Sequence, residues 1–346
     1  MVRVMMVSTA EKSGGGITSV IKLIKRMPVW EKYSCYWLST QIQGSVIKKL
    51  WYAITAAIKA PFIMWQYDII HFHMVPGINL FVQLPELIIA KLYGKKIITE
   101  VHVGNQLVPY SKSNFFRWWL KRAHLVLLLA HKWVNLFHDV YADIKTPVDV
   151  LYNACDSHVP IPLEGKKKII TFVGTMDDNK APDLLLRAWA DLNVKYPDWR
   201  VLFLGQGDID KFHRLADELK VSNVVEFMGQ VSGESKEQIF HDANIYCMCS
   251  YQEGFPMVVL EAWAHSTAVV TTPVGGLPDV IEDGKNCLTF PFGDYKALAS
   301  QLEKLIGNDN LRKNVSECGY RTAQEHFSLE KVNSALVNIY NKVMNE

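Results

Sequence analysis

Several features that mark other protein classes are missing from this 346-residue sequence. Its six cysteines form no C-x-x-C pair, which favours a reducing compartment over a disulfide framework. No apolar run is long enough to span a bilayer. The first residues lack the basic region, separate apolar segment and cleavage site of a signal peptide. We therefore expect a cytoplasmic protein.

Net charge is also nearly absent, at +2, but this value hides an asymmetry. Residues 1–150 hold 18 Lys/Arg against 8 Asp/Glu, whereas residues 151–346 hold 19 against 27. Seven of the ten tryptophans also lie in the first half. A cationic, aromatic-rich half suits an anionic ligand or the inner face of a membrane. The alternative is a basic surface over an aromatic core.

Short apolar or β-branched runs alternate with longer helical patterns along the whole chain, which predicts an α/β fold. The pattern restarts after a stretch rich in proline and lysine at 158–168. We expect two doubly wound, Rossmann-like domains, 1–157 and 158–328, with a C-terminal helix at 329–346 completing the first. Ligands of such sheets bind at the carboxyl ends of the strands.

A triple glycine, Gly14, Gly15 and Gly16, follows the first predicted strand and precedes a predicted helix. Glycines there let backbone N–H groups approach an anion, with Thr18 or Ser19 as the expected helix cap. The alternative is a flexible turn. The segment is not G-x-G-x-x-G, which argues against a nicotinamide dehydrogenase.

Three histidines stand at the ends of predicted strands. His102 ends KKIITEVH, where an imidazole can bond to a sugar hydroxyl. His71 and His73 end DIIHFH in the same way and are the alternative candidates. A single histidine is most often structural, so position at a strand end is the only reason to rank His102 first.

In the second half, Gly174 ends a predicted strand and Lys180 lies just before a helix, where it can face a diphosphate. A lysine in a polar loop is ordinarily solvated surface. Gly275 and Gly276 follow another strand and permit close backbone approach to a bulky ligand, or form a tight turn.

The segment SYQEGFPMVVLEAWAHS is the most informative. Pro256 suits the first helical turn, which leaves the amides of Met257 and Val258 to bind an anion. Glu261 lies one turn further on, within reach of two ribose hydroxyls, and Glu253 precedes the helix. The alternative is that these acids only complement the helix dipole.

Taken in order, these segments resemble glycosyltransferase family 4, a group of retaining enzymes with the GT-B architecture of two Rossmann-like domains facing across a cleft. EGFPMVVLEA resembles its E-x7-E element, GGLPDVI its GGxPE loop, VLYNACD its interdomain segment and IITEVHVG its strand ending in a catalytic histidine. The resemblance runs over almost the whole chain.

The resemblance implies His102 and Glu253 as catalytic residues, with Glu253 on the transferred sugar and Glu261 on the ribose. Lys180 and the glycine loop would hold the diphosphate. The full donor-binding set would comprise Gly14, Gly15, Gly16, Gly174, Lys180, Phe255, Pro256, Met257, Val258, Glu261, Gly275 and Gly276. It also implies a UDP- or GDP-sugar donor, no metal and no other cofactor.

By the same resemblance, a hexose-type sugar would move to a glycan, a lipid-linked or another hydroxyl acceptor, in polysaccharide or glycoconjugate biosynthesis. Same-face attack, with the departing phosphate as the base, would proceed without a covalent sugar intermediate. No nucleic-acid partner is predicted. A sugar-nucleotide epimerase and a nucleotide-sugar-binding protein with weakened turnover are the alternatives.

Three positions depart from the family pattern. Thr175 stands where an arginine commonly follows the strand glycine, which removes one diphosphate cation. Asp279 replaces the usual glutamate of the GGxPE loop, and Met257 replaces a residue that is often small or polar. Lower donor affinity or turnover is the expected consequence.

Two segments of the first half, 48–65 and 113–124, mix lysine or arginine with aromatic residues. On helices, such segments suit docking to anionic lipid or to a lipid-diphosphate acceptor. They suit core packing equally well.

Overall fold

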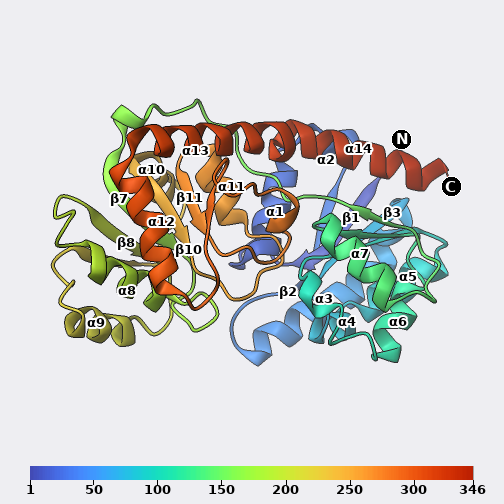
Figure 1. Ribbon diagram of the computed structural model, residues 1–346. Helices are drawn as coiled ribbons and strands as arrows, with labels where there is room; N and C mark the ends of the chain where they lie inside the picture. Colours follow the sequence, from blue (N-terminus) through green and yellow to red (C-terminus); the bar gives the residue numbers. More distant parts are fainter. Residues whose placement is uncertain (346) are drawn as a thin grey trace. The chain divides into compact units, whose positions relative to one another are not determined.

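The structure is a computed structural model that describes residues 1–345, apart from the side chain of Ile78, and it contains two α/β units (Figure 1). The N-terminal unit comprises Met1–Ala154 with Ser328–Glu346, and the C-terminal unit comprises Cys155–Phe327. Within the described chain, none of the helices combines the length and hydropathy needed to cross a bilayer.

The N-terminal unit contains a six-stranded sheet in which every neighbouring pair is parallel, in the order β2-β1-β3-β4-β5-β6. All six residues of β3 are buried, as expected for a central strand covered on both faces. The strands are β1 (Val4–Thr9), β2 (Tyr36–Gln41), β3 (Ile69–Met74), β4 (Lys96–Val101), β5 (Leu125–Leu128) and β6 (Val148–Val150).

Helices connect these strands, as parallel neighbours require. They are α1 (Gly16–Lys25), α2 (Pro28–Lys32), α3 (Val46–Ile63), α4 (Ile78–Val82), α5 (Leu84–Leu92), α6 (Asn114–Leu120) and α7 (His131–Val140). The last helix of the chain, α14 (Leu329–Asn345), joins them: Asn333 Oδ1 accepts a 2.8 Å hydrogen bond from Val29 N, and Asn341 Oδ1 accepts one of 2.8 Å from Tyr33 Oη.

The C-terminal unit repeats the plan with a second parallel sheet, ordered β12-β11-β10-β7-β8-β9. Its strands are β7 (Lys167–Val173), β8 (Arg200–Leu204), β9 (Val225–Gly229), β10 (Ala243–Met248), β11 (Ala268–Thr271) and β12 (Leu288–Thr289). Its helices are α8 (Pro182–Leu192), α9 (Ile209–Glu218), α10 (Glu234–Asp242), α11 (Met257–Ala264), α12 (Tyr295–Gly307) and α13 (Asp309–Thr322), followed by a π-helical turn, η5 (Ala323–Phe327).

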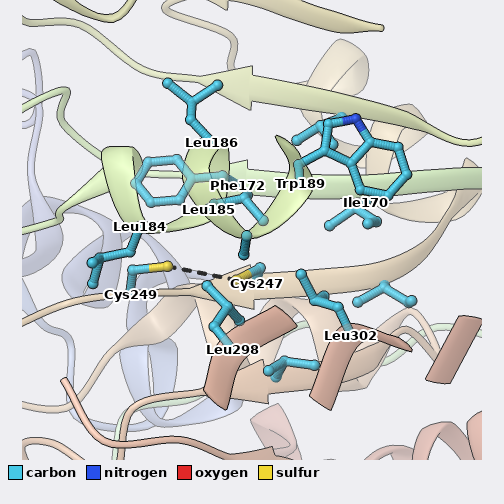
Figure 2. Packing of buried hydrophobic residues seen from close by; sticks show 14 of the residues in the cluster. Ile170, Phe172, Leu184, Leu185, Leu186, Trp189, Cys247, Cys249, Leu298 and Leu302 are labelled. Atoms are coloured by element: carbon cyan, nitrogen blue, oxygen red, sulfur yellow. Dashed lines mark hydrogen bonds between the residues drawn. The ribbon is translucent and has the colours of Figure 1, made fainter. Parts of the chain in front are cut away.

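One face of this second sheet packs against α8 and α12 (Figure 2). Phe172 from β7 and Trp189 from α8 lie in the same fully enclosed cluster as Leu302 from α12. The thiols of Cys247 and Cys249 are 3.6 Å apart within it, and neither forms a disulfide. Burial of these large apolar side chains, at about 25 cal/mol per Å² of surface, holds the strands that carry the site loops.

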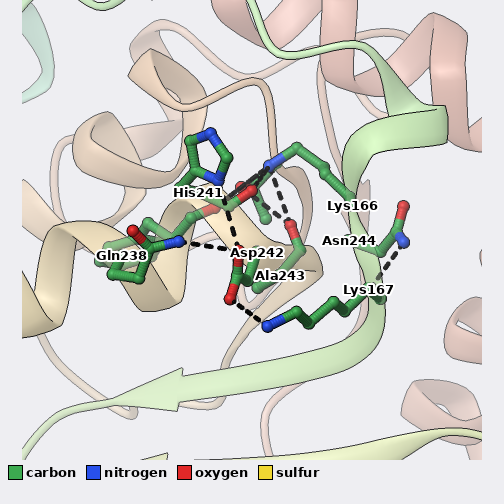
Figure 3. Close-up of polar contacts among 9 residues, drawn as sticks. Lys166, Lys167, Gln238, His241, Asp242, Ala243 and Asn244 are labelled. Carbon is green, nitrogen blue, oxygen red and sulfur yellow. Dashed lines mark hydrogen bonds and ion pairs between the residues drawn. The ribbon is translucent and has the colours of Figure 1, made fainter.

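A buried lysine fixes the carboxyl end of α10 (Figure 3). Lys166 Nζ donates to the carbonyl oxygens of Phe240, His241 and Ala243 at 3.0–3.1 Å. Burial lowers the pKa of Lys166 to about 7. These bonds satisfy carbonyls that the end of a helix leaves without intrahelical partners, so α10 ends in a fixed position.

Candidate functional site

The loop that follows β7 is connected to the loop that follows β10 by hydrogen bonds between Asn179 and two adjacent residues, Tyr251 and Gln252. Asn179 O accepts a 2.7 Å hydrogen bond from Tyr251 N. Its side-chain oxygen accepts from Gln252 N, and its side-chain nitrogen donates to Gln252 O, both at 3.2 Å. Two segments more than 70 residues apart in sequence therefore meet at the carboxyl edge of the sheet.

This connection brings two predicted site residues together as an ion pair, Lys180 Nζ with Glu253 Oε1. Their side chains are only 24% and 13% exposed, so the pair is more shielded than an ordinary surface salt bridge. Lys180 N also donates to Asp177 Oδ1 at 2.9 Å, which fixes the backbone of the loop. Lys180 is thus not the freely solvated lysine that its sequence context allowed.

Gly275 lies against the backbone that carries Glu253. Its φ is +66°, and a Cβ there would lie 2.8 Å from both the Glu253 and the Gly254 carbonyl oxygens. Gly276 N donates to Gly254 O at 2.9 Å. Glycine suits this contact, because its backbone can adopt a positive φ and it has no Cβ to meet these carbonyl oxygens.

Pro256 lies just before helix α11 and not, as predicted, in its first turn. Pro256 is its N-cap, with extended backbone, and Met257 is the first helical residue. The first-turn amides, including those of Met257 and Val258, have no carbonyl four residues earlier within the helix. The ring of Phe255 is buried against Phe327, with ring centroids 5.6 Å apart, so its side chain serves core packing.

Glu261, on α11, meets a residue that the sequence did not single out. Lys236 Nζ, from α10, lies 2.6 Å from Glu261 Oε2. Burial raises the pKa of Glu261, and the ammonium of Lys236 acts in the opposite direction. The C-terminal unit therefore presents two carboxylate–lysine pairs, one on each side of the start of α11.

Thr175 and Asp178 belong to the same loop as Lys180. The Thr175 hydroxyl donates to Asp177 Oδ2, so this residue supports the loop conformation. Lys211 Nζ lies 2.8 Å from Asp178 Oδ1 on the loop, and both side chains are exposed. Gly174 lies beside Lys180, since a Cβ there would come 3.4 Å from the lysine side chain.

In the N-terminal unit, the glycine loop leads from β1 into α1. Gly15, with φ +101°, is the N-cap of α1. The prediction that Thr18 or Ser19 would cap this helix is wrong: both lie inside it, the Thr18 hydroxyl bonds to Thr9, and the Ser19 hydroxyl donates to Gly15 O. Instead Gln43 Oε1, from the segment after β2, accepts a 3.2 Å hydrogen bond from Gly14 N.

His102 follows the last residue of β4 and is 7% exposed, in a buried cluster with Glu100, His71 and His73. His102 Nε2 lies 3.1 Å from His73 Nδ1 and 3.2 Å from Glu100 Oε1. His71 Nε2 lies 3.1 Å from Glu100 Oε2, and its Nδ1 is 3.1 Å from Tyr340 Oη on α14. The three candidate histidines thus form one network instead of being alternatives.

Burial sets the protonation of this network. It lowers the pKa of His73 well below the usual range and also lowers that of His102, although Glu100 opposes both shifts. Burial also opposes ionisation of Glu100, but the adjacent His102, His73 and His71 outweigh it and lower the pKa of Glu100 to about 2. Near neutral pH the network therefore contains the Glu100 carboxylate beside neutral His73 and His102.

The predicted site residues fall into two groups, each within one unit. Gly14–Gly16 and His102 follow strands of the N-terminal sheet at its carboxyl edge. The other group follows strands of the C-terminal sheet and comprises Gly174, Lys180, Glu253, Phe255, Pro256, Met257, Val258, Glu261, Gly275 and Gly276.

The C-terminal unit is similar to a known protein family. Residues 156–322 match the family described as glycosyl transferases group 1. A D-inositol 3-phosphate glycosyltransferase from Corynebacterium aurimucosum is 34% identical over 210 residues, which cover 58% of this chain and 49% of that one. An N-acetyl-alpha-D-glucosaminyl L-malate synthase from Bacillus anthracis is 24% identical over 295 residues, covering 81% and 76%.

Among solved structures, Anabaena HepE in complex with UDP-glucose superposes with a TM-score of 0.77 at 15% identity, covering 99% of this chain and 100% of that one. Together with the two parallel six-stranded sheets, this likeness confirms the predicted α/β GT-B fold. The chain spans about half the length of the first curated relatives it matches.

Proposed function

Because residues 156–322 of this chain match the glycosyl transferases of group 1, we propose that it transfers a hexose-type sugar from a nucleotide-diphosphate sugar to a hydroxyl acceptor. The observation that carries this proposal is the pair of carboxylate–lysine contacts, Lys180 with Glu253 and Lys236 with Glu261, on either side of the start of α11. A sugar with several hydroxyls and a dianionic leaving group need this combination of acceptors and cations.

We assign the transfer to a retaining route that uses no metal. The anomeric C–O bond breaks, and its electron pair leaves with the diphosphate. The first-turn amides of α11 and the ammonium of Lys180 stabilise that charge. The acceptor oxygen bonds to the anomeric carbon on the same face, and its proton passes to the departing phosphate oxygen. Glu253 binds sugar hydroxyls and does not form a covalent adduct.

An anionic acceptor fits this chain best. The names of two relatives specify inositol 3-phosphate and malate as what those proteins act on, and both molecules are anions. Residues 1–150 of this chain hold 18 Lys/Arg against 8 Asp/Glu, so the N-terminal unit attracts negative charge. We therefore propose that this unit receives a small anionic or lipid-diphosphate acceptor.

Donor binding is tested by replacing Glu261, the proposed ribose ligand. Thermal-shift titrations with UDP-, GDP- and ADP-sugars should show stabilisation by one nucleotide class, with UDP-glucose the first choice. Glu261→Ala should weaken binding about 10–100-fold, the loss expected for a hydrogen bond to a charged group. Glu282→Ala, which removes an exposed carboxylate paired with Lys285, is the matched control.

Unchanged donor affinity in Glu261→Ala would contradict the ribose assignment. NMR of the product reports its anomeric configuration, and an inverted product would rule out the retaining route. Conversion of the donor sugar without any acceptor would instead identify an epimerase, and donor binding without turnover would identify a binding protein.

The two segments suggested for membrane docking behave differently. In α6, Phe116, Trp119 and Leu120 are buried, so this helix packs in the core. Helix α3 instead exposes apolar side chains at helical spacing, among them Ile47 at 80% and Ile58 at 61%. The exposed apolar face of α3 and the adjoining turn consists of Ile47, Leu50, Trp51, Ile54, Ile58, Phe62 and Trp65. Lysines of the same helix make docking to anionic lipid the natural use of this face.

Flotation with anionic vesicles tests this role. The wild-type chain should float with phosphatidylserine-containing vesicles, and a variant with Ile54→Glu and Ile58→Glu should bind at least ~10-fold less, because two apolar contacts are replaced by like charge. Val194→Glu changes an equally exposed apolar residue (85%) in the C-terminal unit and should float like wild type. Equal flotation of all three proteins would contradict docking through α3.

A further inference from the structure

A second polar cluster lies in the C-terminal unit, away from the start of α11. Three side chains converge beside a cavity of about 750 Å³: His158, Glu237 on α10, and His265 at the end of α11. Glu237 Oε2 lies 2.9 Å from His265 Nε2 and 3.4 Å from His158 Nε2. The two imidazole rings are 4.0 Å apart.

The hydrogen bond on the far side of His265 fixes which of its ring nitrogens carries a proton. His265 Nδ1 lies 2.8 Å from the carbonyl oxygen of Glu261, and a carbonyl can only accept, so Nδ1 is the donor. In the neutral ring, Nε2 then directs its lone pair at a carboxylate oxygen 2.9 Å away. Such a contact is repulsive unless a cation lies between the two atoms.

The carboxylate oxygen has two close neighbours. Glu237 Oε2 is inaccessible to solvent, and imidazole nitrogens lie 2.9 Å from it on His265 and 3.4 Å from it on His158. A proton on His265 would satisfy only one of these two contacts. A metal ion would satisfy both and would also remove the lone-pair repulsion.

The distances suit a zinc ion. Ligand bonds of ~2.0–2.1 Å in a tetrahedron separate neighbouring ligand atoms by about 3.3 Å. The observed separations of 2.9 and 3.4 Å bracket this value, and all three ligand atoms lie within 4.8 Å of one another. We propose that His158, Glu237 and His265 bind Zn²⁺, with a fourth position open to the cavity.

The surroundings match those of metal-binding histidines elsewhere. A histidine that binds a metal through one nitrogen commonly donates the other N–H to a backbone carbonyl, as His265 does to Glu261. The cavity provides an entry path for the ion. The other histidine cluster, His71 and His73 with Glu100, is fully buried and already joined to Tyr340 and His102, which leaves it no comparable opening.

The bound ion would tie α10 to the end of α11. Lys236 and Glu237 are adjacent on α10, so one residue would hold the ion while its neighbour holds Glu261. The ion would therefore stabilise the position of the proposed ribose carboxylate without contacting the reacting sugar. This metal site does not depend on the proposed transfer reaction.

Calorimetric titration of Zn²⁺ into the full chain, free of a polyhistidine tag and stripped with a chelator, tests the site. One ion should bind per chain. Glu237→Gln and His158→Gln should each weaken binding at least ~100-fold, because even residues that only orient metal ligands contribute 10–100-fold. Both side chains are partly exposed, at 47% and 32%, so these variants should fold.

His241→Gln is the matched control, since His241 lines the same cavity from α10 but its ring bonds to Asp242. It should bind zinc like the wild type. Absence of zinc binding by the wild-type chain would overturn the proposal. Binding that survives Glu237→Gln, or that is lost equally in His241→Gln, would overturn the assignment of these three ligands.

Discussion

Replacing Lys180 with methionine is expected to lower kcat by about 10²–10³-fold, the usual cost of removing one preorganised group that stabilises developing charge. The leaving diphosphate gains negative charge as the anomeric bond breaks, and Lys180 is the cation that the structure places beside Glu253. The loss of kcat should be larger than for a diphosphate-binding lysine that forms no ion pair with a carboxylate. With methionine at 180, the shielded carboxylate of Glu253 loses the ion pair with Lys180 and repels the leaving group.

Glu253→Gln tests the reciprocal role. It removes the negative charge while preserving the shape of the side chain, so binding of sugar hydroxyls weakens but Lys180 stays available to the phosphate. Because the two residues contact each other, their effects should not add. The variant with both substitutions should lose less activity than the product of the two single losses.

Initial rates of transfer, measured with the donor selected by thermal shift, provide the comparison. Lys211→Met is the matched control, because Lys211 also pairs with an aspartate of the same loop but both partners are exposed. Its activity should remain within about twofold of wild type, as expected for a surface pair. A Lys180→Met enzyme with kcat within threefold of wild type would refute the assignment of this lysine to the diphosphate.

The sequence predicted the central strands of both sheets but missed one edge strand of each. Strand β2 (Tyr36–Gln41) contains Ser39 and Thr40 and is only partly buried. Strand β12 (Leu288–Thr289) has two residues. An edge strand has a neighbour on one side only and needs no continuous apolar run, so neither segment carried the pattern that marked β3 or β10.

The candidate site was predictable where a residue lies in a distinctive segment, and not where it depends on a partner far along the chain. Glu253 and Glu261 stand out within one segment, and the structure gives each a lysine partner. Lys236, however, lies in GESKEQ, which looks like any solvated helix start. Its role follows only from the packing of α10 beside α11, which no local pattern reports.

The histidine network shows the same limit. The short run DIIHFH correctly predicts strand β3, but from sequence alone His71, His73 and His102 were alternative candidates for one role. The register between β3 and β4 shows that the histidines share one site. His73 pairs with Glu100 on the neighbouring strand, which brings the carboxylate next to the imidazole rings. Cross-strand register depends on the whole sheet, so a list of strand-end residues could not reveal it.

Acidification is expected to destabilise the N-terminal unit through this network. In the unfolded chain each histidine binds a proton below pH about 6.5. In the folded chain, burial lowers the pKa values of His73 and His102, so these rings stay neutral. The unfolded state then binds more protons, and the free energy of unfolding falls by about 2 kcal/mol per pH unit below 6.5, until the folded rings begin to titrate. Glu100, with its pKa lowered to about 2, causes a second decrease in the free energy of unfolding between about pH 4.3 and 2.

Urea unfolding at about pH 7, 6 and 5 measures the first of these losses as a slope. His73→Asn or His102→Asn should roughly halve the slope, because one of the two titrating groups is gone. Phe72→Leu is the matched control: Phe72 lies between His71 and His73 on β3, is fully buried, and has no proton to gain. It should lower the free energy of unfolding by about 1 kcal/mol at every pH and leave the slope unchanged. An equal slope in the wild type and both histidine variants would show that these rings bind as many protons in the folded chain as in the unfolded chain, which would contradict the lowered pKa values of His73 and His102.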